Sequence, residues 1–400
     1  MADNKRNILL ITSLYPADDI QFKNNTAVCH YFAKEWLRLG YVVRVINLYN
    51  IYPSYYYPAL KLFKNVFADK FGIAILDKRK KNEHNYVIDG INVTRLPAYK
   101  SKPHGDFSEK VVGKLAERII SIVEEENFVP DFILGHFLLP SIRVISILKE
   151  KYPQTVTTIA LHGKERHIIP AVQQCLPSIN YIGYRSYSIK TSFETLYGHK
   201  PSFMCMSGIP SEFIVDHERT FDRGIHNFIY VGAFMRRKFP SCLIPAIVNN
   251  YPNKDFVITY VGDGNGVNDV KKEAKKRAVV ENVRFTGRIP RSDINAKLDK
   301  AEVFIMISER ETFGLVWLEA MARGCITVAS RDEGMDGVIE DGVNGFLCKA
   351  GDVEELSEIV SRIKTMDRES LYKMSKCAIE TAKEMTDIKM AERYIESISK

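Results

Sequence analysis

The fold is indicated by the stretch that begins Asn7-Ile-Leu-Leu-Ile-Thr-Ser13 and ends Tyr41-Val-Val-Arg-Val-Ile-Asn47. Both ends are short apolar runs of the kind that form buried strands in a parallel sheet. Between them, residues 26–39 carry apolar side chains three or four positions apart, which predicts a helix, and Gly40 marks its end. Strand, helix and strand in this order form a βαβ unit, so we expect a sheet covered by helices on both faces.

The same alternation continues along the chain, with a break at residues 207–226, where the pattern loosens into charged and turn-forming residues. Further strands are predicted at residues 132–135, 157–161, 181–184, 227–232, 256–262, 283–287, 303–308 and 326–330. Several strands after the break end in Gly or Ser, as expected where strand ends meet a ligand cleft. We therefore predict an α/β fold of two doubly wound, Rossmann-like domains facing an inter-domain cleft. The predicted domains are residues 1–206 and 207–382, with a C-terminal helix at 383–400 packing back on the first domain.

Composition excludes several classes of protein. A chain of 400 residues suits two domains, and 46% hydrophobic with 26% charged residues excludes disordered and fibrous architectures. There is no run of about 18 apolar residues and no signal-peptide pattern, so we expect neither a membrane span nor secretion. The seven cysteines are scattered without a CxxC pair, which favours a reducing cytoplasm and argues against structural zinc.

The positive charge of the chain is concentrated in one segment. The 56 basic residues exceed the 49 acidic ones by 7, an excess too small for a nucleic-acid binder. Residues 60–81, inside a basic and aromatic insertion at 52–82, hold seven basic and two acidic residues and so contribute 7 − 2 = +5. Two interpretations stay open: an apolar stripe packed on the domain with solvated lysines, or a patch that binds an anionic membrane surface from the cytoplasmic side. Liposome flotation distinguishes them.

The stretch with the most chemical information is Ser308-Glu-Arg-Glu-Thr-Phe-Gly-Leu-Val-Trp-Leu-Glu-Ala-Met-Ala-Arg-Gly324. Thr312 is the predicted N-cap of a helix over residues 313–323, directly after a predicted strand. A helix N-terminus in that place suits a diphosphate, and Gly314 would let an anion approach the backbone. Glu311 and Glu319 add carboxylates, which accept hydrogen bonds from sugar hydroxyls.

This string, with Glu311 and Glu319 eight positions apart, closely resembles the retaining glycosyltransferases of family 4 (group 1), which have the two-domain GT-B fold. The resemblance is densest over residues 227–352. Other matching segments are Tyr260-Val-Gly-Asp-Gly264, Val283 to Gly287, Asp341-Gly-Val-Asn-Gly-Phe-Leu347, Pro130-Asp-Phe-Ile-Leu-Gly-His136 and His162-Gly163.

The resemblance implies roles for residues of the second domain. Glu311 would contact the donor-sugar hydroxyls, Glu319 the nucleotide ribose, and Lys238 the diphosphate. Ala233 stands where the family has an arginine and Phe239 where it has a glycine, so Arg236 or Arg237 is the candidate for the missing charge. The implied donor-binding residues, besides Glu319, are Gly232, Arg237, Gly262, Arg288, Thr312, Phe313, Gly314 and Leu315.

In the first domain, His136 matches a histidine that lies beside the transferred sugar in the family, and with Glu311 and Lys238 it completes the implied catalytic set. The family's glycine pair in the first loop is replaced by Asn24 and Asn25, which with His162 are the candidate acceptor-side residues. Each of these also has a structural interpretation. His136 and His162 are also compatible with buried structural histidines at strand ends, and Lys238 with a basic surface patch.

The resemblance implies a metal-independent, retaining glycosyltransferase without a cofactor that uses a nucleotide-sugar donor, with UDP favoured over GDP. The acceptor would be a glycan or a lipid-linked sugar, in cell-surface polysaccharide biosynthesis. Ala233 and the missing glycine pair motivate one alternative, a catalytically silent homologue that acts as a glycan-binding or partner subunit. A nicotinamide dehydrogenase is set aside because no G-x-G-x-x-G joins the first strand and helix.

Overall fold

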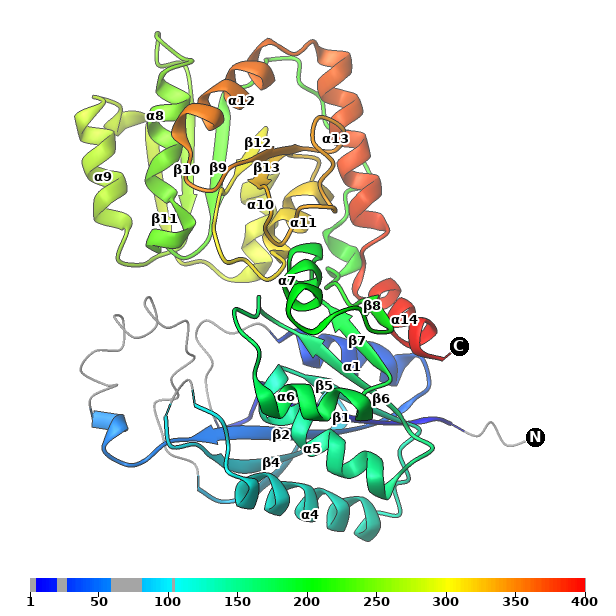
Figure 1. Cartoon of the computed structure of the whole chain (residues 1–400). Helices are drawn as coiled ribbons and strands as arrows, with labels where there is room; N and C mark the ends of the chain where they lie inside the picture. The colour runs from blue at the N-terminus through cyan, green and yellow to red at the C-terminus, as the bar shows by residue number, and fades with distance from the viewer. Residues whose placement is uncertain (1–4, 20–26, 59–80, 103–104, 400) are drawn as a thin grey trace. The chain divides into compact units, whose positions relative to one another are not determined.

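The computed structural model describes residues 5–19, 27–58, 81–102 and 105–399. The chain divides into two compact units (Figure 1). The first unit holds the described chain up to Arg185, together with Ile189–Cys205 and the C-terminal segment from Met390. The second holds Ser186–Ser188 and Met206–Lys389.

The first unit is built on an eight-stranded sheet in the order β3-β4-β2-β1-β5-β6-β7-β8. All neighbouring strands are parallel except β3, which pairs antiparallel with β4. The strands are β1 (Asn7–Thr12), β2 (Val42–Ile51), β3 (His84–Ile88), β4 (Ile91–Tyr99), β5 (Phe132–His136), β6 (Val156–Leu161), β7 (Tyr181–Tyr184) and β8 (Ser202–Met204). The helices of this part of the chain are α1 (Val28–Arg38), α4 (Glu109–Glu125), α5 (Leu138–Lys151), α6 (Pro170–Cys175), α7 (Tyr187–Tyr197) and α14 (Asp387–Ile398).

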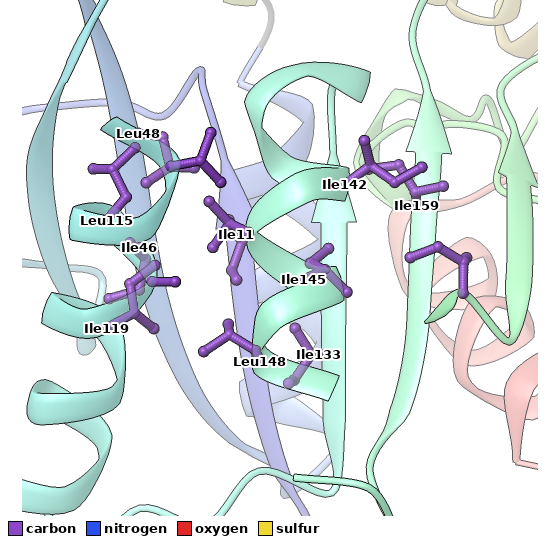
Figure 2. Packing of buried hydrophobic residues seen from close by; sticks show 14 of the residues in the cluster. Ile11, Ile46, Leu48, Leu115, Ile119, Ile133, Ile142, Ile145, Leu148 and Ile159 are labelled. Atoms are coloured by element: carbon purple, nitrogen blue, oxygen red, sulfur yellow. The ribbon is translucent and has the colours of Figure 1, made fainter. Parts of the chain in front are cut away.

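The core of the first unit lies between this sheet and helices α4 and α5. Figure 2 shows Leu115 and Ile119 of α4 and Ile145 of α5 directed onto Ile11 and Ile46 of the central strands. All five side chains are buried, and burying an aliphatic side chain of this size stabilises the fold by about 2 kcal/mol. Because β2 and β5 lie on opposite sides of β1, the right-handed connections that parallel strands favour would place α1 and α4 on opposite faces of the sheet.

The C-terminal helix α14 is part of the first unit from Met390 onward. The indole of Trp36 donates a hydrogen bond to the Ala391 carbonyl at 3.1 Å and packs edge-on against the ring of Tyr394. The Tyr394 hydroxyl in turn lies 3.1 Å from the hydroxyl of Thr158 on β6. The C-terminal helix therefore packs against residues of α1 and β6 in the first unit.

The second unit has a six-stranded, fully parallel sheet in the order β11-β10-β9-β12-β13-β14. Its strands are β9 (Asn227–Val231), β10 (Val257–Val261), β11 (Val283–Gly287), β12 (Val303–Ile305), β13 (Ile326–Ser330) and β14 (Phe346–Cys348). Its helices are α8 (Leu243–Val248), α9 (Val267–Lys276), α10 (Ile294–Leu298), α11 (Leu315–Ala322), α12 (Val353–Thr365) and α13 (Arg368–Lys383). The order reverses between β9 and β12, as in a doubly wound dinucleotide-binding sheet.

The predicted doubly wound α/β fold is confirmed, and every strand predicted by residue range is present. The strand predicted at 303–308 is shorter and ends at Ile305. The β3–β4 hairpin was missed, although its Asp89-Gly90 turn is a known hairpin signal. Both turn residues have positive φ, at 48° and 78°.

The helix predicted at 313–323 begins later, at Leu315, and Gly314 rather than Thr312 is its N-cap. Gly314 has φ +109°, and a Cβ there would lie 2.2 Å from a ring carbon of Trp317. The chain therefore turns sharply at Gly314, which only glycine allows, before the helix can start.

No helix of the described residues is both long enough and apolar enough to cross a membrane. The basic segment 60–81 lies outside the described residues except for Lys81, so its binding to an anionic membrane surface stays a prediction.

Candidate functional site

Two loops of the second unit lie next to each other at the carboxyl edge of its sheet. One follows β9 and the other follows β12, and these strands are direct neighbours, with Val303 opposite Phe228. This is the point where the strand order reverses, the place where doubly wound sheets bind their ligands. The backbone N–H of Glu309 donates a hydrogen bond to the Arg237 carbonyl at 2.8 Å and ties the two loops together.

Glycines allow a third loop to approach the first. Gly232 follows β9 and Gly262 follows β10, with φ +129° at Gly262. A Cβ on Gly262 would lie 2.0 Å from the Gly232 carbonyl oxygen, so no other residue fits. These two predicted donor-site glycines therefore allow the loops after β9 and β10 to pack closely together.

Glu311 lies between two cations. Its carboxylate is 3.1 Å from Nη1 of Arg237, 3.6 Å from Nζ of Lys238 and 3.3 Å from the hydroxyl of Ser308. Burial alone would raise the pKa of Glu311, but the charges of Lys238 and Arg237 outweigh it, so the pKa lies below its ordinary value. Glu311 is thus ionised at neutral pH, and the three groups together carry one net positive charge.

The structure distinguishes the two arginines that follow Ala233. Both belong to a short 3-10 turn, Arg236–Lys238, but the side chain of Arg236 is exposed while that of Arg237 reaches Glu311. Successive residues in such a turn point in different directions, and here the turn directs Arg237 and Lys238 inward.

The loop after β13 contacts the backbone of the loop that carries Glu311. The Glu333 carboxylate accepts a hydrogen bond from the backbone N–H of Glu311 at 2.8 Å. At the next residue, Gly334, a Cβ would lie 2.3 Å from the carbonyl oxygen of Phe313. The sequence did not predict the contact between Glu333 and Glu311, because nothing in residues 331–334 indicates which backbone group they meet.

Glu319 has a different partner. It lies on α11, is 4% exposed and meets Arg291, whose Nε donates a 2.8 Å hydrogen bond to Oε1. Arg291 Nη2 lies 2.6 Å from the same oxygen. The Arg291 guanidinium also lies over the ring of Phe213, 5.1 Å from its centroid. The two predicted glutamates therefore have separate cations, and Arg291 was not found from the sequence.

The other predicted donor-site residues lie around these two. Phe313 is buried, Thr312, Gly314 and Leu315 are half-buried, and Arg288 is exposed just beyond the end of β11.

The predicted residues of the first unit form a second cluster. His136 ends β5, is fully buried, and its Nδ1 lies 2.9 Å from Nε2 of His162, which stacks on Phe137. Burial and the charge of Arg185 lower the pKa of His136 to about 3. The pKa of His162 is also lowered, so both rings are neutral at pH 7.

Cys29 completes a group with the donor types that zinc prefers, because its sulfur and one nitrogen of each histidine lie within 4.8 Å of one another. However, the charge of Arg185 acts on all three side chains and would oppose a divalent cation. We therefore assign no metal to this group. Asn24 and Asn25 lie outside the described residues, so their acceptor role stays a prediction.

Known proteins resemble both the second unit and the whole chain. Residues 218–385 match the family model described as Glycosyl transferases group 1. An uncharacterized glycosyltransferase of Methanocaldococcus jannaschii is 26% identical over 332 residues, which is 80% of this chain and 89% of that protein. The lipopolysaccharide core biosynthesis glycosyltransferase LpsE of Rhizobium meliloti is 32% identical over 133 residues, 33% of this chain and 38% of LpsE.

Among solved structures, Anabaena HepE in complex with UDP superposes with a TM-score of 0.70 at 16% identity. The superposition covers 98% of this chain and 99% of HepE, so the fold is shared over the whole length. The family match thus lies in the second unit, over residues 218–385, while the fold shared over the whole chain is the GT-B fold of glycosyltransferases.

Proposed function

We propose that the protein is a retaining, metal-independent glycosyltransferase that moves a sugar from a nucleotide-diphosphate donor to a glycan or lipid-linked acceptor. The observation that carries the proposal is the ionised Glu311 held between Lys238 and Arg237 where the strand order of the second unit reverses. A UDP-sugar is favoured over a GDP-sugar, and cell-surface polysaccharide biosynthesis is the proposed setting.

The two cations of the proposed site, Lys238 and Arg237, would act on the negative charge that develops in the reaction. When the bond between the sugar and the phosphate breaks, negative charge grows on the leaving diphosphate, and Lys238 and Arg237 would stabilise it. One well-placed cationic or hydrogen-bonding group contributes about 3 kcal/mol to such a step. Arg237 thereby takes over the charge that Ala233 does not supply. The Glu311 carboxylate, held by both cations, would accept hydrogen bonds from donor-sugar hydroxyls.

Retention of configuration requires no protein nucleophile in the proposed mechanism. The acceptor hydroxyl attacks the anomeric carbon on the face that the diphosphate leaves, and its proton passes to the departing phosphate oxygen. One carbon–oxygen bond breaks and another forms on the same face. This agrees with the geometry at Glu311, whose charge is already satisfied by two cations and a hydroxyl.

The proposal is tested by incubating the purified chain, in the presence of EDTA, with UDP- and GDP-sugars and a panel of glycan and lipid-linked acceptors. Nucleotide release that depends on the acceptor, with a product of retained anomeric configuration by NMR, is the expected result. Lys238→Ala should lower the rate about 100-fold, and the exposed Arg236→Ala on the same turn is the matched control. Nucleotide binding without transfer to any acceptor would favour the silent homologue, and inhibition by EDTA would contradict metal independence.

A further inference from the structure

Arg291 is a further residue of the donor site to which neither the sequence nor the family match assigns a role. We propose that it is a positioning residue. It holds the Glu319 carboxylate so that one oxygen faces the ribose hydroxyls of the donor, and it thereby makes the site select ribonucleotides over deoxyribonucleotides. This inference rests on the proposed function.

Glu319 lies in buried surroundings, where a carboxylate needs a partner. Its neighbours on α11, Leu318 and Ala320, are fully buried, and Glu319 itself is 4% exposed. A carboxylate in such surroundings is costly unless a cation and hydrogen bonds compensate it. Among the described residues, the salt bridge of Glu319 is with Arg291.

The contact with Arg291 uses one of the two carboxylate oxygens of Glu319. Both guanidinium nitrogens, Nε at 2.8 Å and Nη2 at 2.6 Å, meet Oε1. The second oxygen, Oε2, lies outside this ion pair. A carboxylate fixed through one oxygen can present the other in a constant direction, as recognition of a pair of ribose hydroxyls requires.

Arg291 is itself held by a neighbouring ring while its side chain stays partly exposed. Its guanidinium lies 5.1 Å from the ring centroid of Phe213, a contact that restricts the side chain. Its side chain is 34% exposed, compared with 5% for Glu319, so the pair lies at the boundary between interior and surface. Arg291 follows β11, whose carboxyl end lies at the same edge of the parallel sheet as the loops after β9 and β12.

The experiment measures the dissociation constants of UDP, 2′-deoxy-UDP and 2′,3′-dideoxy-UDP by calorimetry, and repeats them with the GDP series. The wild-type protein should prefer the ribonucleotide to the dideoxynucleotide about tenfold, the value of one to two charge-assisted hydrogen bonds. In Arg291→Ala that preference should fall to within twofold, because UDP affinity drops while dideoxy-UDP affinity stays. Arg291→Lys keeps the charge but loses the second contact, and should give an intermediate preference.

Arg284→Ala is the matched control, since Arg284 is an exposed arginine on β11 itself. A loss of affinity in Arg291→Ala that is equal for UDP and dideoxy-UDP would show a merely structural role and overturn the inference. Equal binding of UDP and dideoxy-UDP by the wild-type protein would also overturn the inference, but it would not contradict the proposed function. If the wild-type protein binds no nucleoside diphosphate, both the proposed function and the role of Arg291 are contradicted. If Arg291→Ala does not fold, Arg291→Lys decides, because an unchanged ribose preference in that folded variant contradicts the positioning role.

Discussion

At the scale of single residues, the proposed donor site gives Glu311 and Glu319 different tasks because they have different partners. Glu311→Ala should lower kcat about 100-fold while the dissociation constant of UDP stays within twofold, since Glu311 would contact the sugar. Glu319→Ala should instead weaken UDP binding about tenfold. Steady-state kinetics and calorimetry measure the two effects. An equal loss of UDP affinity in both variants would contradict the assigned roles.

The charge of Glu311 also determines a pH dependence. Its pKa is lowered because Lys238 and Arg237 outweigh burial, so its ionised form persists as pH falls and is lost only when pH passes below that depressed pKa. The kcat/KM of the wild-type protein should therefore stay constant from neutral pH down to the ordinary glutamate pKa of about 4.3. In Lys238→Met, one of the charges that lower the pKa of Glu311 is lost, so this pKa rises. The fall of kcat/KM at acidic pH, its acid limb, should therefore move to higher pH. An acid limb at the same pH in both proteins would show that Glu311 does not control it.

Glu333 is expected to act through the backbone of Glu311. Glu333→Ala removes the acceptor of the 2.8 Å hydrogen bond from the Glu311 N–H and should lower kcat/KM about tenfold, the value of one charge-assisted hydrogen bond. Glu333→Gln keeps an oxygen in that place and should restore most of the activity. Steady-state kinetics with a UDP-sugar measures both. If glutamine is as damaging as alanine, the role of Glu333 lies in its charge and not in this hydrogen bond.

At the scale of elements, the start of α11 depends on one glycine. Gly314→Ala would force a Cβ to within 2.2 Å of the Trp317 ring at φ +109°, and should lower the free energy of unfolding by about 2 kcal/mol or more. Gly287 is the matched control: its φ is +69°, but its Cβ would meet no atom within 4 Å. Gly287→Ala should therefore cost about 1 kcal/mol. Urea denaturation measures both variants, and equal losses would show that the Trp317 contact has no effect.

The elements also show what the sequence alone could predict. Strands such as β1 and β9 were predictable because a buried parallel strand is a continuous apolar run. Glu311 and Glu319 were predictable because they lie in one long distinctive string. Their partners Arg291 and Glu333 were not, because each comes from a different loop and meets its glutamate only through the packing of the sheet. The start of α11 was misplaced because the Cβ clash at Gly314 is invisible in the sequence.

At the scale of the whole molecule, the end of the chain stabilises a unit formed mostly by its beginning. Tyr394 is fully buried in the first unit, in ring contact with Phe32, Trp36 and Phe203, and its hydroxyl meets Thr158. Removing such an aromatic side chain leaves a cavity and typically costs 3–5 kcal/mol. Losing the hydroxyl alone costs about 1 kcal/mol.

Tyr394→Ala should therefore destabilise the first unit strongly and Tyr394→Phe slightly, while the exposed Glu396→Ala on the same helix should change nothing measurable. Hydrogen exchange followed by mass spectrometry reports the two units separately. In Tyr394→Ala, the slow amides of β1 and β5 should exchange faster, because they open with the first unit, while those of β9 and β12 should keep their rates. Uniformly faster exchange in both sheets would mean that the units unfold together and that α14 stabilises the chain as a whole.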